Sequence, residues 1–230
     1  MNYIIGDIHG NFTELEKLLT IIKPQANDRL IFLGDYLDKN SGTKRTLDLL
    51  HQLADTHDCV FLKGNHEYVW EKYLLGHELQ RRDFLLKFGG LEMLKEFSPE
   101  AERLLLEDKI DAISVFLKEY LNLLPHMKNY ATVGSYLALH AGITDEQMDS
   151  TPLVFDEPNY FLRPDHIPTE LKYLGQYTLV AGHTHLSPEP VKLPGYINVD
   201  LGAGFGKYLG AFCPETSQVI RSDGKIFELG

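Results

Sequence analysis

The stretch RLIFLGDYLDKNSG (residues 29–42) joins a buried strand to two acidic residues. Its first part is apolar from Leu30 to Leu33, which is typical of a strand buried in a sheet. Asp35 and Asp38 follow after a single glycine. A carboxylate at the end of a buried strand is costly in free energy unless a cation compensates its charge. The stretch therefore predicts a cationic partner for Asp35.

Strand-like and helix-like segments alternate through the first third of the chain. Apolar runs typical of strands are separated by segments in which leucine and isoleucine recur at helical spacing. In order, these segments are the strand at 2–5, the helix at 12–22, the strand at 29–33, the helix at 43–54 and the strand at 58–62. This βαβαβ order predicts an α/β fold with a mostly parallel sheet.

Two later regions differ from this pattern. Residues 68–125 contain leucine, glutamate and lysine at helical spacing, with a Gly-Gly break and a stop at Pro125. We expect this segment to form a helical cap inserted into one domain that spans residues 1–230. Short strands separated by Gly, Pro and Asn resume from about residue 129.

Composition and charge exclude several classes of protein. A chain of 230 residues with 43% hydrophobic content can bury one sizeable core. The formal net charge of -11 disfavours binding to duplex nucleic acid, which depends on Lys and Arg neutralising phosphates. No apolar run is long enough to span a membrane, and residues 2–5 read as a strand with no leader before them. We therefore expect a cytoplasmic protein that binds neither nucleic acid nor membrane.

Five strand-like runs end at a glycine with metal-competent side chains beside it. They are IIGDIHG (Asp7, His9), FLGDYLD (Asp35, Asp38), FLKGNHE (Asn65, His66), LALHAG (His140) and LVAGHTH (His183, His185). Because the carboxyl ends of strands in α/β folds face one edge of the sheet, these side chains should converge there. The cationic partner of Asp35 is therefore expected to be a metal. The other histidines belong to no motif, and we expect surface or structural roles for His51, His57, His77, His126 and His166.

The ligand types fit two metal ions better than one. Carboxylate, imidazole and amide oxygen together suit manganese, iron or zinc, whereas an all-oxygen set would favour magnesium or calcium. Two ions about 3.5–4 Å apart can share a carboxylate and stabilise both the attacking and the leaving oxygen of an in-line phosphoryl displacement. We expect two divalent ions bridged by Asp35, with manganese favoured over iron and zinc.

These motifs resemble those of the calcineurin-like metallophosphoesterase superfamily. The blocks GDIHG, GDYLDKN, GNHE, HAG and GHTH match its motifs in order and spacing from residue 6 to residue 185. GDIHGN, GDYLD and GNHE are similar to the Ser/Thr-specific protein phosphatases and the related bacterial dinucleoside tetraphosphatases, and GGLEMLKEF is similar to bacterial members of that branch. We expect two mixed β-sheets packed as a sandwich and flanked by helices.

The resemblance also implies the ligands of both metals. They are Asp7, His9 and the additional His185 for the first metal, Asp35 for the bridge, and Asn65, His140 and His183 for the second metal. The protein phosphatase branch usually lacks a histidine at the place of His185.

Two further motif residues match a proton donor and its partner. By resemblance, His66 protonates the leaving oxygen and Asp38 orients it. The chemistry of the residues agrees, because neighbouring cations press a histidine toward neutrality and a carboxylate partner restores its ability to carry a proton.

The chain departs from the protein phosphatase pattern at Lys39 and Asn40, where that pattern has Arg followed by Gly. An Arg would clamp phosphate with a planar two-pronged fork, whereas Lys offers one compact charge. We expect Lys39, together with Asn65, to contact the phosphate of the substrate. Arg163, in YFLRPDH, either supplies the fork instead or forms a structural ion pair.

The resemblance implies an enzyme that hydrolyses phosphoric esters. Our leading prediction is a dimetal phosphatase that acts on phosphomonoesters of Ser or Thr, in a phosphorylated protein or a small phosphoester. Three alternatives stay open: a dinucleoside polyphosphate hydrolase with the same site, a phosphodiesterase, which the GHTH ending suggests, and a non-catalytic binding module on the same fold. The complete set of ligands and the candidate acid argue against the last of these.

Overall fold

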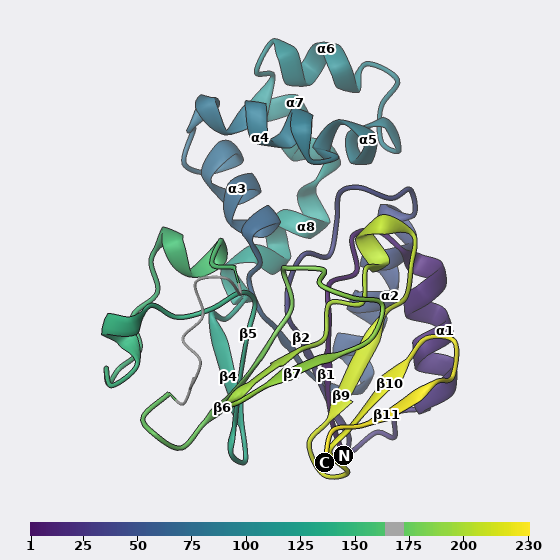
Figure 1. The fold of residues 1–230 in the computed structure, drawn as a ribbon. Coiled ribbons are helices and arrows are strands. Elements are labelled where there is room, and N and C mark those ends of the chain that lie inside the picture. The colour runs from purple at the N-terminus through teal and green to yellow at the C-terminus, as the bar shows by residue number, and fades with distance from the viewer. Residues whose placement is uncertain (164–172) are drawn as a thin grey trace.

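The computed structural model describes residues 1–163 and 173–230, so that His166 lies outside the described residues (Figure 1). The described strands form one six-stranded and one five-stranded sheet. Each sheet contains parallel and antiparallel pairs. The predicted α/β fold with two mixed sheets and flanking helices is confirmed.

The first sheet is built around the βαβαβ unit. Its parallel strands β1 (Asn2–Ile5), β2 (Arg29–Phe32) and β3 (Asp58–Phe61) are joined by α1 (Phe12–Ile22) and α2 (Thr43–Thr56). Apolar residues one turn apart, such as Leu15 and Leu18 in α1 and Leu47 and Leu50 in α2, are buried against the sheet. Both helices cover the same face of the sheet (Figure 1).

Strands from the far end of the chain complete the first sheet. β9 (Gly210–Cys213) pairs antiparallel with β1, so that Ile4 lies opposite Phe212. β10 (Gln218–Arg221) and β11 (Ile226–Glu228) follow as an antiparallel meander. The resulting strand order is β11-β10-β9-β1-β2-β3. The N-terminal strand is therefore held between parallel β2 and antiparallel β9.

The second sheet has parallel strands at its centre and antiparallel strands at its edges. Its central strands are β5 (Tyr136–Leu139), β6 (Thr178–Ala181) and β8 (Tyr196–Asn198). β4 (Tyr130–Val133) pairs with β5, and β7 (Val191–Leu193) pairs with β8. The strand order is β4-β5-β6-β8-β7.

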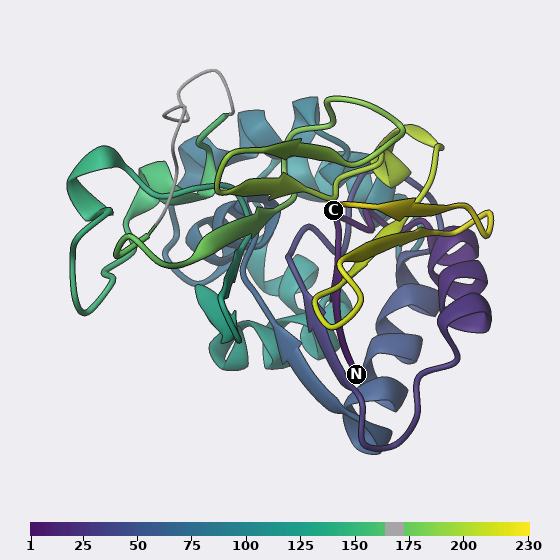
Figure 2. The same ribbon diagram turned by 60° about the horizontal axis from the view of Figure 1, so that its bottom comes forward.

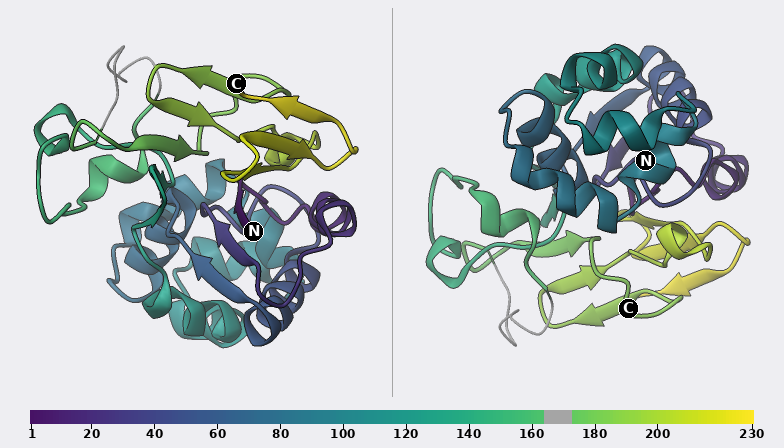
Figure 3. Two further views of the ribbon diagram at one scale, coloured as in Figure 1. Left: turned by 90° about the horizontal axis from the view of Figure 1, so that it is seen from below. Right: turned by 90° about the horizontal axis from the view of Figure 1, so that it is seen from above.

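The two sheets pack face to face over an apolar core. Ile4, Ile31 and Val60 of the first sheet and Val180 and Ile197 of the second belong to one buried cluster. Neighbouring residues along β1 and β2 point to the other face, toward α1 and α2, as strand alternation requires. Figures 2 and 3 show the strands of residues 173–230 on one side of the molecule and the βαβαβ unit on the other.

A helical segment lies between β3 and β4. It contains α3 (Asn65–Leu74), α4 (Arg82–Lys87), α5 (Gly90–Lys95), α6 (Ala101–Leu106), α7 (Ile110–Phe116) and α8 (Lys118–Leu123) (Figure 1). Its large buried side chains, including Trp70, Tyr73 and Tyr120, join the same apolar cluster as α1 and α2. Among the described residues, every helix is too short or too polar to cross a membrane.

Candidate metal centre

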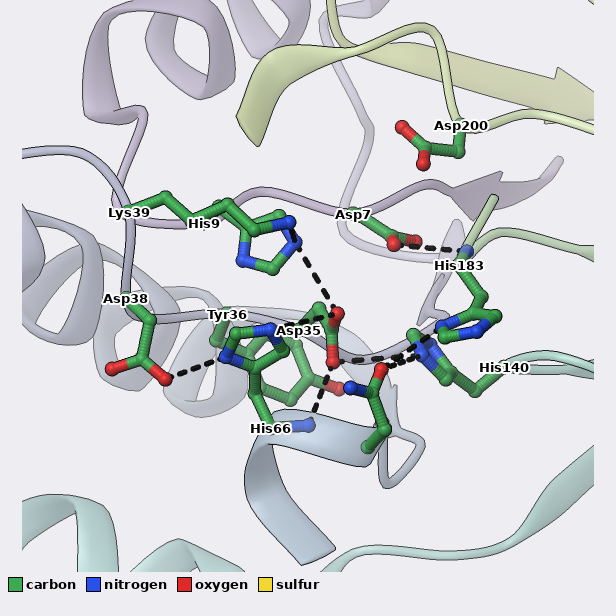
Figure 4. Close-up of polar contacts among 12 residues, drawn as sticks. Asp7, His9, Asp35, Tyr36, Asp38, Lys39, His66, His140, His183 and Asp200 are labelled. Carbon is green, nitrogen blue, oxygen red and sulfur yellow. Dashed lines mark hydrogen bonds and ion pairs between the residues drawn. The ribbon is translucent and has the colours of Figure 1, made fainter. Parts of the chain in front are cut away.

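Asp35 lies at the centre of a buried group of imidazoles just beyond the end of β2 (Figure 4). Its Oδ2 is 3.2 Å from His9 Nε2 and 3.9 Å from His66 Nε2, and its Oδ1 is 3.5 Å from His140 Nε2. In the described part of the chain, two groups of side chains could each hold a metal ion: His9, Asp35 and His66, and Asp35, His140 and His183. Because Asp35 belongs to both groups, it can bridge two ions.

Asn65 and His183 extend the second group. The Oδ1 atom of Asn65, the first residue of α3, lies 2.9 Å from both His140 Nε2 and His183 Nδ1. His140 follows β5 and His183 follows β6, so the ends of these two strands meet the start of α3 here. An amide oxygen, two imidazoles and the Asp35 carboxylate thus face one another, which is a donor set suited to a first-row transition metal.

Asp7 supports the presence of a cation at this edge of the sheet. Its Oδ2 accepts a hydrogen bond from the His183 N–H at 2.9 Å. Within the described residues, its Oδ1 and His183 Nε2 are both buried without a hydrogen-bond partner. Burial, followed by the nearby carboxylates of Asp200 and Asp35, raises the pKa of Asp7 well above its usual range. A bound divalent cation would satisfy the orphaned oxygen and reverse this shift.

The imidazoles are held in the form that binds metals. Burial and the neighbouring His140 lower the pKa of His183 to about 3, and burial also lowers the pKa values of His9 and His140. Although burial opposes ionisation of Asp35, the imidazoles around it hold its pKa well below the usual range. Neutral imidazoles and an ionised carboxylate are the states required of metal ligands.

His66 is paired with Asp38 inside the protein. His66 Nδ1 lies 2.6 Å from Asp38 Oδ2, and both side chains are buried. The indole N–H of Trp70 is within 3.1 Å of both Asp38 oxygens and donates to that carboxylate. Burial opposes the charged imidazolium, but Asp35 and Asp38 raise the pKa of His66. With Nδ1 engaged by Asp38, Nε2 is the atom that faces Asp35 and can exchange a proton.

Another buried carboxylate, Glu67, fixes the turn that carries Asp35. It accepts hydrogen bonds from the backbone N–H groups of Asp35 (2.6 Å), Tyr36 (3.1 Å) and Gly64 (3.0 Å). Burial and the nearby Asp35 raise the pKa of Glu67 to about 7. Glu67 therefore ties the β2 loop to the start of α3.

Several site residues have left-handed backbone, with φ between 50° and 68° at His9, Asp35, Asp38, Lys39 and His183. Such conformations cost about 1–3 kcal/mol each and persist only where the surroundings fix them. The hydrogen bonds to Glu67 are one such constraint at Asp35.

A cleft of about 410 Å³ opens beside Asp35 and His66. Predicted site residues line it, namely Lys39, Asn65, Arg163, His183 and His185, together with the aromatic rings of Phe84, Phe88, Phe161 and Phe205. Lys39 Nζ lies 2.7 Å from His9 Nε2, whereas the side chain of Arg163 is exposed. The cleft thus brings two cationic side chains to the same space as the metal-type ligands.

His185 lies at the rim of this cleft. Its Nδ1 is 3.3 Å from the carbonyl oxygen of Asp200, and its Nε2 is 3.1 Å from Lys207 Nζ. Neither His185 nor Asp7 joins the two groups of ligands that Asp35 links among the described residues.

Two contributing residues were not singled out from the sequence as site residues: Glu67 and Asp200. Asp200 carries a detectable signal, because YINVDLG repeats the pattern of an apolar run that ends in an acid near a glycine. Glu67 stands within GNHE, but its role depends on backbone groups 31 and 32 residues away.

Comparison with known proteins identifies the family of this chain. Residues 3–211 match the model of the calcineurin-like phosphoesterase family. The chain belongs to this family. It is therefore a hydrolase of phosphoric esters. Phosphoesterases of this family use a dinuclear centre of divalent metals, and the two groups that share Asp35 could hold such ions.

Individual relatives cover most of the chain. A bis(5'-nucleosyl)-tetraphosphatase PrpE [asymmetrical] from Geobacillus sp. is 25% identical over 91% of this chain and 88% of its own length. The cold-active protein-tyrosine phosphatase of a psychrophilic Shewanella has the same fold, with a TM-score of 0.63 and 18% identity over 100% of this chain and 80% of its own. A putative diadenosine tetraphosphatase aligns with a TM-score of 0.53 and 19% identity over 98% and 91%.

Proposed function

We propose that this phosphoesterase hydrolyses dinucleoside polyphosphates of the bis(5'-nucleosyl)-tetraphosphate type. The observation that carries the proposal is the composition of the cleft, which places Lys39, Arg163 and several aromatic rings beside the Asp35 centre. Cationic side chains suit a polyphosphate chain, and aromatic rings suit nucleobases. The tetraphosphatase relatives, which align with about nine-tenths of the chain, support this substrate class.

We assign the metal ligands as the motifs suggest. Asp7, His9 and His185 would hold the first ion, Asn65, His140 and His183 the second, and Asp35 would bridge them, with manganese favoured. When bound, the two ions supply charge stabilisation for the phosphoryl oxygens and lower the pKa of a coordinated water. The buried side chains that would hold the ions are shielded from bulk water.

We assign proton delivery to His66. Its Nδ1 is fixed by Asp38, so its Nε2 can donate a proton to the oxygen that leaves phosphorus. Asp38 holds the ring in orientation and stabilises its positive charge, and Trp70 in turn holds Asp38. Lys39 and Arg163 would bind phosphoryl oxygens from the open side of the cleft, with Asn65 near the same phosphate.

The helical segment completes the cleft in this proposal. Phe84 belongs to α4 and Phe88 directly follows that helix, and both line the cleft. We therefore treat residues 68–125 as a cap within one domain of residues 1–230.

A second candidate is hydrolysis of Ser or Thr phosphomonoesters, and one observation favours it. The buried His66–Asp38 pair has the arrangement of a histidine and carboxylate that deliver a proton. An alkoxide is a poor leaving group that needs such a proton, whereas the phosphate end of a nucleotide leaves with little help.

The deciding experiment is a substrate panel on metal-stripped protein resupplied with manganese, iron, zinc or magnesium. Diadenosine tetraphosphate, a phosphoserine peptide and a chromogenic phosphodiester would be compared by kcat/KM, with chromatography of the nucleotide products. We expect diadenosine tetraphosphate to be the best substrate by at least about tenfold, which is about 1.4 kcal/mol of transition-state discrimination. A phosphopeptide preferred by the same margin would overturn the proposal in favour of the second candidate. ATP plus AMP as products indicates asymmetrical cleavage, and two ADP indicates symmetrical cleavage.

A further inference from the structure

The loop formed by residues 202–207 crosses the rim of the cleft. It follows β8 and Asp200 and contains a single 3₁₀ turn, Ala203–Phe205. Gly204 lies directly against the metal-type ligand His9, because a Cβ atom added there would be 2.4 Å from His9 Cδ2. The loop therefore approaches the centre so closely that its place relative to His9 is fixed.

Two asparagines, from the loops that follow β1 and β2, anchor this loop. The Nδ2 groups of Asn11 and Asn40 donate to the Ala203 carbonyl oxygen at 3.0 and 3.1 Å. Asn40 Nδ2 also lies 3.0 Å from the His9 carbonyl oxygen. Asn40 is the residue that stands where the protein phosphatase pattern has glycine. Its side chain thus links the backbone at His9 to the 202–207 loop, a link that glycine cannot make.

Phe205 is presented by this anchored loop as an exposed ring. It is 63% exposed although it lines the cleft. Its ring centroid is 4.9 Å from Lys39 Nζ and 5.7 Å from the His185 ring. Lys207, two residues on, lies with its Nζ 3.1 Å from His185 Nε2. An aromatic face and two lysines therefore stand together at the rim.

The other rings of the cleft are engaged with one another. Phe84 packs on Phe88 with ring centroids 4.5 Å apart and on His66 at 5.2 Å, and it contacts Phe161 at 6.2 Å. These contacts support the His66 side of the cleft. Phe205 takes no part in this aromatic group, and the exposed part of its ring has room for a flat ligand.

We propose that the 202–207 loop is a nucleobase site, in which Phe205 stacks on one base of the substrate and Lys207 pairs with the adjoining phosphate. The inference rests on the proposed dinucleotide function and deepens it. Bases stack on exposed aromatic side chains with little dependence on base identity, and a nearby ammonium group neutralises phosphate. Asn40 acts as a positioning residue that holds the ring over the cleft.

The test measures nucleotide binding separately from turnover of the natural substrate. Hydrolysis of p-nitrophenyl phosphate in constant excess manganese reports on the centre, and ATP and inorganic tripolyphosphate serve as inhibitors with and without a base. Phe205→Ala should raise the inhibition constant of ATP about 5- to 100-fold. The inhibition constant of tripolyphosphate should change by less than about twofold, because that inhibitor has no base to stack.

Matched variants complete the design. Phe205→Tyr keeps an aromatic ring and should keep the wild-type inhibition constant for ATP. Lys207→Ala should weaken the binding of ATP and of tripolyphosphate to the same extent. Ile226→Ala removes a side chain of similar exposure (54%) from the edge strand β11 and should change neither inhibition constant. A Phe205→Ala variant that binds both inhibitors as the wild type does, or loses both equally, overturns the nucleobase site.

Asn40 is tested by its coupling to Phe205. Asn40→Ala should raise the ATP inhibition constant in the wild type. In the Phe205→Ala background it should raise that constant by less than about twofold, because both substitutions remove the same stacking interaction. Full additivity would overturn the positioning role.

The two proposals fail in different ways. Wild-type enzyme that leaves diadenosine tetraphosphate intact while it hydrolyses p-nitrophenyl phosphate overturns the proposed function. An unchanged preference of the Phe205→Ala variant for ATP over tripolyphosphate overturns the loop site alone.

Discussion

The floor and the rim of the cleft are built in opposite ways. The floor consists of Asp35 and the side chains gathered around it, and Asp35 itself is 2% exposed. The rim consists of Lys39, Arg163, Phe205 and Lys207, and Phe205 is 63% exposed. Floor residues are held by buried hydrogen bonds, whereas Arg163, Phe205 and Lys207 are exposed and Lys39 is half-buried. In the proposed function, the floor sets the reaction and the rim selects the substrate.

The largest effect is expected from a change to the floor, Asp35→Asn. One neutral amide oxygen cannot offset the charge of two cations, so metal content and turnover should both fall to near zero. Elemental analysis, activity and circular dichroism would be measured on the same sample, with circular dichroism expected to show an intact fold. Two tightly bound ions with near-normal activity in this variant would contradict the bridging role.

A smaller effect is expected from His66→Asn, and it should depend on the leaving group. Loss of a general acid should lower the rate on an alkyl phosphate about 10²–10⁴-fold. The loss should be clearly smaller with p-nitrophenyl phosphate, whose leaving group hardly needs a proton. Equal losses on both substrates together with lost metal would make His66 a ligand, as its place in the group with His9 and Asp35 allows.

At the rim, Lys39→Ala and Arg163→Ala should act mainly on KM. A charged hydrogen bond contributes about 1.5–3 kcal/mol, so loss of the half-buried Lys39 should raise KM about 10- to 100-fold on every phosphoester. Exposed Arg163 should contribute less because water screens its charge. Steady-state kinetics of both variants provide the comparison. A severe loss in Arg163→Ala beside a mild one in Lys39→Ala would show that Arg163 is the main phosphate ligand.

The smallest effect is expected away from the cleft, at the ion pair between Arg81 and Glu157. Hydrogen bonding from Arg81 lowers the pKa of Glu157, so the pair stabilises the fold above the unfolded-state pKa of Glu157 and loses this contribution as pH falls through the folded-state pKa. Glu157→Gln should cost about 0.2–1 kcal/mol at pH 7 and leave kcat unchanged. Urea unfolding of both proteins at pH 7 and pH 3 checks this. A difference that widens at pH 3 would refute the assignment.

Much of the fold was predictable because its signals are local. The apolar runs of β1, β2 and β3 and the helical spacing of α1 and α2 each appear within a few residues. By contrast, β7 was not predicted, since Val191–Leu193 is a three-residue run between Pro190 and Pro194, and proline is typical of turns and strand edges. The pairing of Ile4 with Phe212 was also beyond local signals, because nothing near either residue specifies a partner so far along the chain.

The floor was more predictable than the rim for a similar reason. Each floor residue follows a strand and stands beside a glycine, and that pattern recurs along the chain. Phe205 and Lys207 belong to no such pattern, and their place depends on the Ala203 carbonyl meeting Asn11 and Asn40. Contacts between residues so far apart in the sequence are set by tertiary packing alone.

The left-handed backbone at the site also restricts how these positions can vary in a mutational scan. At Asp35 and Asp38, with φ of 54° and 68°, most residues other than Gly, Asn and Asp would add about 1–2 kcal/mol of steric strain. A library selected only for folding would therefore already be depleted of most substitutions at both positions. Intolerance there cannot by itself identify a ligand or a proton relay. Substitution by asparagine separates the need for a left-handed backbone from the need for a negative charge, because asparagine accepts the conformation and lacks the charge.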